Sequence, residues 1–465
     1  MNLLTRDKII KISFSLFFIK VISAIYLNFA SIVTPHIHRQ TDTLGVTLRY
    51  WQKFNFEVFH WTNLLPSVLN AGKHGDIMPM EFPLINLILS PFFALPFDNK
   101  LAIVMMVYLV ITTGLFIINY KVWKDIQLYN VSMAIPMAIL PLTSFFIDFS
   151  TKLIPDVWSS LLIFIAMGLI ISSNSKRLLS FILITLGLLI KPTSITAFGL
   201  LLILDKKKVF KVSLSLIAPA VLITIFYYKF GCQFIDFFRT EKSLFAYKIH
   251  SPLELFLDFF SEGKRIFKLM NDFFLIRFGS IIVILVAAFK IFSKRDRKVL
   301  ALLFIISLQL LTIILLRGGM LFAHQYYFLS FTPTLLLFSF YVLRDLNFRF
   351  LFTLIAIILV VRNFELMIHE NKSILSQKNR HSRIRQQCNK LRDRNPEFPW
   401  ARNFIFRSSQ TPYPEIGLCF LERTSSEKSG YGLDFLSTPL PKNCTEVDRT
   451  NDIKIYRCDD FLSFR

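Results

Sequence analysis

The chain has 465 residues, of which 54% are hydrophobic, and it carries a formal net charge of +22. Its mean hydropathy of +0.52 excludes an ordinary soluble domain, and its continuous apolar runs are not the alternating segments of a membrane β-barrel. The positive charge does not indicate nucleic-acid binding, because many Lys and Arg residues lie in short loops between apolar runs, as the positive-inside rule expects.

These apolar runs predict an all-α polytopic membrane protein with about 11–13 membrane helices, since a span takes about 20 apolar residues. The N-terminal run lacks a small-residue cleavage site, so it is interpreted as the first membrane helix. Several runs are shorter than a full span, which predicts tilting, thinning of the bilayer or a stop at a buried polar site. The predicted helices are 12–33, 101–119, 129–147, 157–173, 178–190, 193–204, 210–230, 278–292, 298–316, 325–343 and 350–362.

Basic residues predict the orientation of these helices. Those that flank the first helix place the N-terminus in the cytoplasm, and later clusters follow in alternate loops. The apolar run 83–97 complicates this alternation; we expect that it dips into the membrane and returns, or that one short segment elsewhere compensates for a full crossing. The cytoplasmic clusters are Arg6/Lys8/Lys11, Lys121/Lys124, Lys176/Arg177, Lys206/Lys207/Lys208, Lys294/Arg295/Arg297 and Arg344/Arg349.

The outward-facing segments include two long regions. Residues 34–82 carry Trp and Phe among polar residues, which predicts a first outer loop of interfacial helices within a membrane domain of residues 1–362. Residues 363–465 are predicted to form a small extracytoplasmic α+β soluble domain, with a helical stretch at 366–394 and strands at Ile416–Leu421 and Ile453–Arg457. Its Cys388, Cys419, Cys444 and Cys458 allow three disulfide pairings, and their spacing argues against a zinc site.

Acidic residues stand at three predicted helix starts on the outward face. Asp42 follows the first helix, where a carboxylate could act as a base or simply cap a helix. Glu81 precedes Pro83 at another helix start, where capping and a role in the same outer cavity both remain open. Asp156 directly precedes an apolar run, so it is expected at membrane depth, where ionisable groups are costly and tend to be functional.

Cationic and aromatic residues form the other candidates. Lys191–Pro192 separates two apolar runs that are too short to span, on the side with few other cations. Snorkelling would explain the charge, but a phosphate partner also explains the paired short helices. Arg317, His324, Tyr326 and Tyr327 lie around the start of a later helix, where they could donate to a phosphate or sugar or form an aromatic belt.

Five short motifs occur in a characteristic order: Arg39-Gln40-x-Asp42, Glu81-Phe82-Pro83-Leu84, Pro155-Asp156, Leu189-Ile190-Lys191-Pro192, and His324-x-Tyr326-Tyr327 with Pro333 beyond. In this order they resemble the GT-C superfamily of membrane glycosyltransferases, and most of all bacterial family 39, the protein mannosyltransferase and aminoarabinose transferase group. The resemblance covers about residues 10–362. It implies a GT-C-like fold in a bacterial inner or plasma membrane.

The resemblance also implies an inverting transfer of a sugar from a polyprenyl-phosphate donor to a hydroxyl of a lipid, glycan or protein acceptor. Asp42 would act as base or orient the acceptor. Many relatives have two adjacent acids here, whereas Asp42 is followed by Thr43, so a metal requirement is doubtful and no cofactor is expected. Arg39, Gln40, Glu81 and Asp156 would hold the sugar or acceptor, and Lys191, Arg317, His324, Tyr326 and Tyr327 would bind the lipid phosphate.

Two other functions remain open. A transporter or flippase of lipid-linked saccharides would show corresponding broken helices in both halves, and the sequence shows one break, at Lys191–Pro192. A membrane-anchored structural or partner-binding protein would work through residues 363–465 alone. The dense aromatic and polar content of the first outer loop argues against such a passive anchor.

Overall fold

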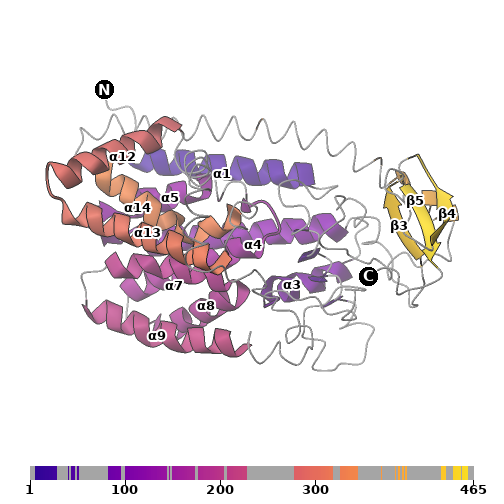
Figure 1. The fold of residues 1–465 in the computed structure, drawn as a ribbon, viewed down its shortest axis with the longest axis horizontal. Coiled ribbons are helices and arrows are strands. Elements are labelled where there is room, and N and C mark those ends of the chain that lie inside the picture. The colour runs from indigo at the N-terminus through magenta and orange to yellow at the C-terminus, as the bar shows by residue number, and fades with distance from the viewer. Residues whose placement is uncertain are drawn as a thin grey trace. The chain divides into compact units, whose positions relative to one another are not determined.

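The structure is a computed structural model, and most of the residues that it describes are helical (Figure 1). The chain forms two compact units, one of Met1–Ala24 with Leu109–Ile368 and one of Ile25–Tyr108 with His369–Arg465. The predicted division at residues 362 and 363 lies outside the described residues and stays a prediction. The described residues are 6–28, 40, 43–44, 46–47, 50–51, 82–95, 100–143, 146, 149–172, 176–203, 207–227, 277–317, 325–343, 368, 383, 386–387, 390–391, 393–394, 431–435, 444–451 and 453–458.

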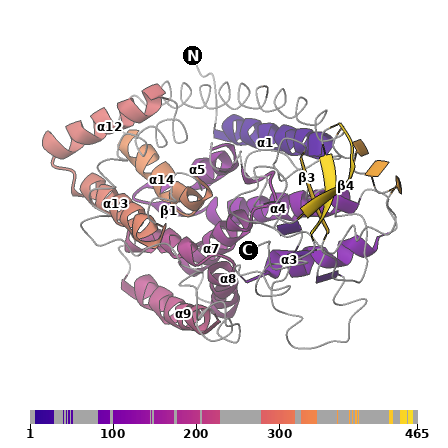
Figure 2. The ribbon, with the colours of Figure 1, turned by 45° about the vertical axis from the view of Figure 1, so that its right-hand side comes forward.

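Three successive helices of the first unit run side by side, as Figures 1 and 2 show: α7 (Pro155–Ser172), α8 (Arg177–Ile190) and α9 (Lys207–Phe226). The sequence predicted each of them, and all three are confirmed as helices. Of the three, α7 is buried from Pro155 to Ile170, which fits an apolar helix that is enclosed by other elements. It therefore forms much of the core of this unit.

A second group in the same unit consists of α12 (Arg277–Phe292), α13 (Arg297–Arg317) and α14 (Thr332–Leu343). The 3-10 helix η9 (Gln325–Phe331) leads directly into α14, so the predicted helix at 325–343 is helical throughout but not α-helical in its first part. Lys290 donates to the carbonyl of Tyr341 at 3.2 Å, and the Tyr341 hydroxyl donates to Asp296 at 3.1 Å. These bonds join the end of α14 to the turn between α12 and α13.

Two long helices at the start of the chain, α1 (Arg6–Asn28) and α4 (Lys100–Trp123), contain boundaries between the units. Within the first unit, the ring of Phe116 lies 5.0 Å from that of Phe17 and 5.4 Å from that of Phe146, both in edge-on geometry. Such aromatic pairs add to the stabilisation from area burial. The helices predicted at 12–33 and 101–119 are confirmed over the described ranges Arg6–Asn28 and Lys100–Trp123, whereas 350–362 lies outside the described residues.

The prediction of one continuous helix at 129–147 is wrong. A hairpin of β1 (Gln127–Leu128) and β2 (Val131–Ser132) stands at its start, followed by the short helices α5 (Ala134–Ile139) and η4 (Leu140–Leu142). The two turn residues between β1 and β2 both have positive φ, which closes a tight hairpin that a helix cannot contain. The segment predicted as a helix at 193–204 forms η6 (Pro192–Ile203), a 3-10 helix.

The apolar run 83–97 forms two short pieces in the second unit, α3 (Leu84–Leu89) and η3 (Ser90–Ala94). At standard rises these pieces cover about 19 Å, less than the roughly 30 Å of a bilayer core. In α3, Asn86 donates to the carbonyl of Thr43 at 2.6 Å and to the Thr47 hydroxyl at 3.1 Å. The two described pieces are shorter than a full crossing, and the return of the segment 83–97 stays a prediction.

The described part of the C-terminal region contains an antiparallel sheet in the order β3-β5-β4 (Tyr431–Phe435, Ile453–Cys458 and Cys444–Arg449). The predicted strand at Ile453–Arg457 is confirmed as β5, while Ile416–Leu421 lies outside the described residues. The strands β3 and β4 were not predicted. In the register of β4 and β5, the backbone of Cys444 lies opposite that of Cys458, but the disulfide pairing stays a prediction.

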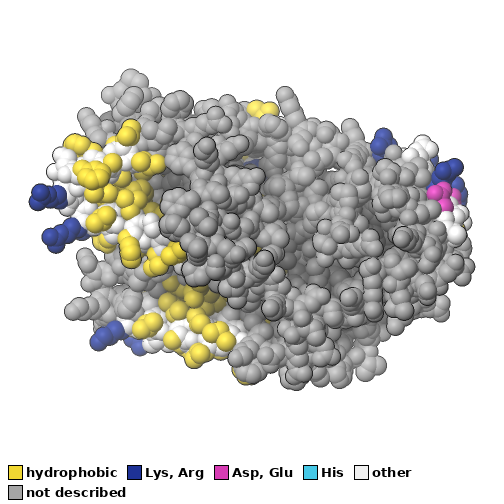
Figure 3. Space-filling view, viewed as in Figure 1, with side chains coloured by type: hydrophobic (Ala, Val, Ile, Leu, Met, Phe, Trp, Pro, Cys, Tyr) yellow, Lys and Arg dark blue, Asp and Glu magenta, His cyan; other side chains and the backbone are white. Residues whose placement is uncertain are grey.

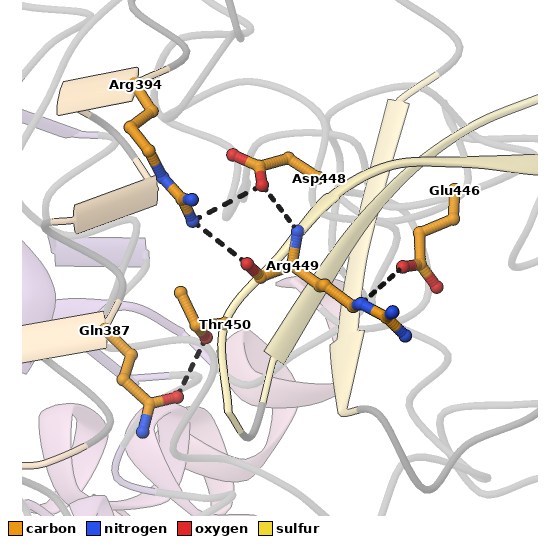
Figure 4. Close-up of polar contacts among 6 residues, drawn as sticks. All are labelled: Gln387, Arg394, Glu446, Asp448, Arg449 and Thr450. Carbon is orange, nitrogen blue, oxygen red and sulfur yellow. Dashed lines mark hydrogen bonds and ion pairs between the residues drawn. The ribbon is translucent and has the colours of Figure 1, made fainter.

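Polar side chains join this sheet to helical residues that precede it (Figure 4). Arg394 forms an ion pair with Asp448 at 3.3 Å and donates to the carbonyl of Arg449 at 3.0 Å. The Thr450 hydroxyl donates to Gln387 at 2.8 Å. Arg394 and Gln387 belong to the predicted helical stretch 366–394, whose described residues are all helical. The described part of the tail thus combines helix and strand.

The helices of the first unit run between two ends that differ in charge. The start of α8 and the α12–α13 turn lie at one end (Figure 1). This end exposes Lys176, Arg177, Lys294 and Arg295, and is called the basic end here. Figure 3 shows Lys and Arg at this end and hydrophobic side chains along the helices beside them. The opposite end, called the site end, lies about 21 Å away along α8 and holds Lys191.

Among the described residues, three helices are long and apolar enough to cross a membrane: Ile103–Trp123, Pro155–Ser172 and Tyr326–Leu343. Large apolar side chains on α8, α9, α12 and α13 are also exposed.

Candidate functional site

The antiparallel arrangement of α7 and α8 brings together Asp156 and Lys191. Pro155 occupies the first position of α7, where its fixed φ suits a helix start, and Asp156 follows in the first turn. Lys191 comes directly after the end of α8, in extended backbone geometry. Its Nζ lies 3.6 Å from Oδ1 of Asp156, and the two side chains are only 2% and 3% exposed.

The two helices also favour the two charges. Asp156 lies at the N-terminal end of α7, where the helix dipole stabilises an anion. Lys191 lies at the C-terminal end of α8, where the dipole of that helix stabilises a cation. Burial makes each charge depend on the other, because removing one partner of a buried pair costs about 3–5 kcal/mol. The fold therefore holds an ammonium group in a place where water is largely absent.

Two tyrosine rings from η9 also lie close to this ammonium group. Lys191 Nζ lies 5.0 Å from the ring centroid of Tyr327 and 5.6 Å from that of Tyr326. The two rings are 4.9 Å apart, and Phe149 packs edge-on against Tyr326 at 6.0 Å. The negative faces of such rings attract a cation, and more strongly where it is desolvated.

The helix break at Lys191 is held by side chains from α7 and η6. The backbone N–H of Lys191 donates to the carbonyl of Gly187 at 3.0 Å, which also accepts from the Ser159 hydroxyl at 2.7 Å. The hydroxyls of Ser159 and Ser194 lie 2.6 Å apart, and the N–H of Ser194 donates to the carbonyl of Lys191 at 3.0 Å. These bonds satisfy backbone groups at the break, which would be costly to leave unpaired in an apolar interior.

A second set of polar contacts joins the 3-10 helices η6 and η9. The hydroxyls of Thr196 in η6 and Ser330 in η9 form a hydrogen bond. Gln309 of α13 donates to the carbonyl of Thr196 at 2.6 Å and to the hydroxyl of Thr334 at 3.1 Å. The segment that follows Lys191 and the segment that carries the two tyrosines are therefore fixed to each other.

The structure brings together four of the residues that the sequence singled out: Asp156, Lys191, Tyr326 and Tyr327. The sequence placed Asp156 with the sugar or acceptor and the other three with the phosphate, and the contact between Asp156 and Lys191 joins these two sets. Arg317 ends α13, and nothing further is described of its side chain. Gln40 is buried in the second unit. Arg39, Asp42, Glu81 and His324 lie outside the described residues.

Sequence reasoning missed several buried polar residues of the first unit. Lys152 is buried in the loop before α7, four positions before Asp156, and Ser159 and Ser194 support the helix break. Gln309 lies within a long apolar run of α13. A polar residue isolated in an apolar run is a detectable signal, since such residues are costly in a membrane and usually face the bundle interior.

Among the described residues, no group of three or more His, Cys, Asp or Glu side chains lies close enough to hold a metal ion. Comparisons with protein-family models, with curated proteins and with solved structures find no match to this chain.

Proposed function

We propose that this chain is a polytopic membrane glycosyltransferase, which moves a sugar from a polyprenyl-phosphate donor to an acceptor hydroxyl on the non-cytoplasmic face. The observation that carries the proposal is the buried ammonium of Lys191, held by Asp156, Tyr326 and Tyr327 at the site end. A buried cation among hydroxyl-bearing rings suits a ligand that joins a phosphate to a polar sugar and an apolar chain.

The location of the charges supports a membrane protein whose site end faces away from the cytoplasm. Three described helices could cross a bilayer by length and composition. The basic end would face the cytoplasm by the positive-inside rule, so the site end would face outward. Lys191, buried and paired with Asp156, would then lie on the outward side.

In the proposed reaction, the acceptor oxygen attacks the anomeric carbon on the face opposite the lipid phosphate. The bond between that carbon and the phosphate oxygen breaks, and its electron pair leaves with the phosphate. Lys191 would stabilise the charge that grows on this leaving group, an effect that is large where water is excluded. The acceptor proton would pass to Asp42, a role that comes from the family resemblance and concerns a residue outside the described part of the chain.

The test is release of polyprenyl phosphate by the purified chain in lipid nanodiscs, supplied with a panel of polyprenyl-phosphate hexoses and pentoses and crude envelope acceptors. We expect Asp42→Asn to abolish release. We expect Lys191→Gln to reduce it by roughly 10²–10³-fold, the usual effect of removing a charge-stabilising group, and Lys191→Arg to retain part of it. Thermal unfolding of each variant checks that it is folded. Full activity in folded Asp42→Asn and Lys191→Gln would contradict the proposal.

One structural observation favours a second candidate, a flippase for lipid-linked sugars. The 3-10 segment η6, which follows the break at Lys191–Pro192, contacts a second 3-10 segment, η9, through Thr196 and Ser330. Helical segments that depart from regular α-helix and meet within a membrane domain are typical of transporter substrate sites. Vesicles that hold the chain and a fluorescent polyprenyl-phosphate sugar distinguish the two: movement of intact lipid between leaflets without phosphate release would identify a flippase.

A further inference from the structure

The turn between α12 and α13 presents three cations to the surroundings and keeps its carboxylate inside. Lys294, Arg295 and Arg297 are exposed within four positions. Asp296 accepts from the backbone N–H groups of α13 and from the Tyr341 hydroxyl at 3.1 Å, so its charge is engaged inward. The outer surface of the turn is therefore positive.

The backbone at Arg295 does not by itself favour an arginine. Its φ is 50°, in the left-handed region where glycine is the residue of least strain. The turn closes the end of α12 through a hydrogen bond from the N–H of Asp296 to the carbonyl of Lys290 at 3.0 Å, and a glycine would form this turn more readily. An arginine in this conformation points to a role for its side chain outside the turn.

Exposed apolar side chains continue from the turn along both helices. Phe292 is 84% exposed at the end of α12, and Phe304 is 67% exposed two turns into α13, with Leu285 and Leu300 exposed beside them on these helices. Figure 3 shows this hydrophobic surface next to the Lys and Arg side chains. A row of apolar side chains that ends in cations matches a molecule with long apolar chains and an anionic head.

We propose that the α12–α13 turn binds the phosphate of an anionic phospholipid, whose acyl chains lie along α12 and α13. The charge selects an anionic head, and the adjoining apolar rows select a lipid over a soluble anion. This site lies at the basic end, away from the Lys191 group, so it does not depend on the proposed transferase activity.

The experiment measures phosphatidylglycerol and phosphatidylcholine retained by the full chain in detergent, by native mass spectrometry. We expect the wild-type chain to prefer phosphatidylglycerol. Arg295→Gly should raise the melting temperature, because it relieves the left-handed strain, yet weaken phosphatidylglycerol binding about fivefold; Lys294→Gln/Arg295→Gly/Arg297→Gln should weaken it about 100-fold. Lys211→Gln, which removes an exposed cation from α9, is the matched control and should leave binding unchanged.

Unchanged phosphatidylglycerol binding in the triple variant would overturn the proposal, as would equal loss in Lys211→Gln. Displacement of the lipid by an equal concentration of inorganic phosphate would also overturn it, because the ligand would then be a free anion. Should Arg295→Gly fail to fold, Arg295→Asn replaces it, since asparagine tolerates the left-handed conformation and carries no charge.

Discussion

The contact between Asp156 and Lys191 has two physical explanations that make different demands on the side chains. If the pair only fixes the start of α7 to the end of α8, two well-packed apolar residues can take its place, since such exchanges are often neutral or stabilising. If the ammonium group binds a phosphate, no apolar residue can replace it. Stability and activity therefore separate these explanations.

We expect Lys191→Met to lower the free energy of unfolding by about 3–5 kcal/mol, because Asp156 would be left as an unpaired buried charge. The double variant Asp156→Leu/Lys191→Met should recover most of this loss but release no polyprenyl phosphate. Thermal unfolding in detergent and the release assay measure the two effects. Recovery of activity together with stability would show that the pair is structural.

Among the secondary-structure elements, the sequence predicted those that the pattern of apolar residues marks. The apolar run of α7 and its Pro155–Asp156 start were predictable, and so was the break at Lys191, because a charge and a proline interrupt an apolar run. The 3-10 winding of η6 was not predictable, since α and 3-10 helices bury similar patterns. The hairpin of β1 and β2 depends on the positive φ of two turn residues. These two residues lie among apolar residues, so the sequence was interpreted as one continuous helix.

The candidate site was predictable as a set of residues but not as a set of contacts. The sequence singled out Asp156 and Lys191 separately, and only the packing of α7 on α8 makes them partners. That packing depends on Gly187, where a Cβ would lie 2.6 Å from Cγ1 of Ile163 and 3.1 Å from the carbonyl oxygen of Ser159. The sequence does not show which helix packs against a glycine in an apolar run; the structure is needed for that.

Gly187→Ala should therefore destabilise the chain, because overpacking costs about 1–3 kcal/mol and exceeds the gain in helix propensity. Gly114→Ala in α4 is the matched control: nothing lies within 4 Å of its added Cβ, so it should be neutral or stabilise by up to about 1 kcal/mol. The melting temperatures of the two variants are compared in the same detergent. Equal melting temperatures would mean that α7 and α8 can separate slightly at no cost.

For the whole molecule, the main prediction concerns the two ends of the first unit. The sequence alone arranged the basic clusters in alternate loops, and the structure brings the start of α8 and the α12–α13 turn to one end of the helices (Figure 1). Sequence could not show how the helices pack between the ends, because lipid-facing and partner-facing apolar residues look alike in an apolar run.

Membrane-impermeant maleimide tests whether these ends correspond to two sides of a membrane. In a chain whose native cysteines are replaced by serine, Ser293→Cys should react only after the cells are opened, because it lies at the basic end. Val447→Cys, exposed in the C-terminal sheet, should react in intact cells if that region is extracytoplasmic as predicted. Labelling of both or neither in intact cells would contradict the proposed topology.

The 3-10 winding of η6 affects the length of this segment and therefore the depth of Lys191. Each residue of a 3-10 helix rises about 2.0 Å, so the 12 residues of η6 extend about 24 Å, whereas an α-helix of the same length would extend about 18 Å. Rewinding this one segment would thus change its length by about 6 Å. Because Thr196 is tied to Gln309 and Ser330, the five residues from Pro192 to Thr196 would transmit about 2–3 Å of that change to Lys191, so the pitch of this helix helps to set the depth of the ammonium group.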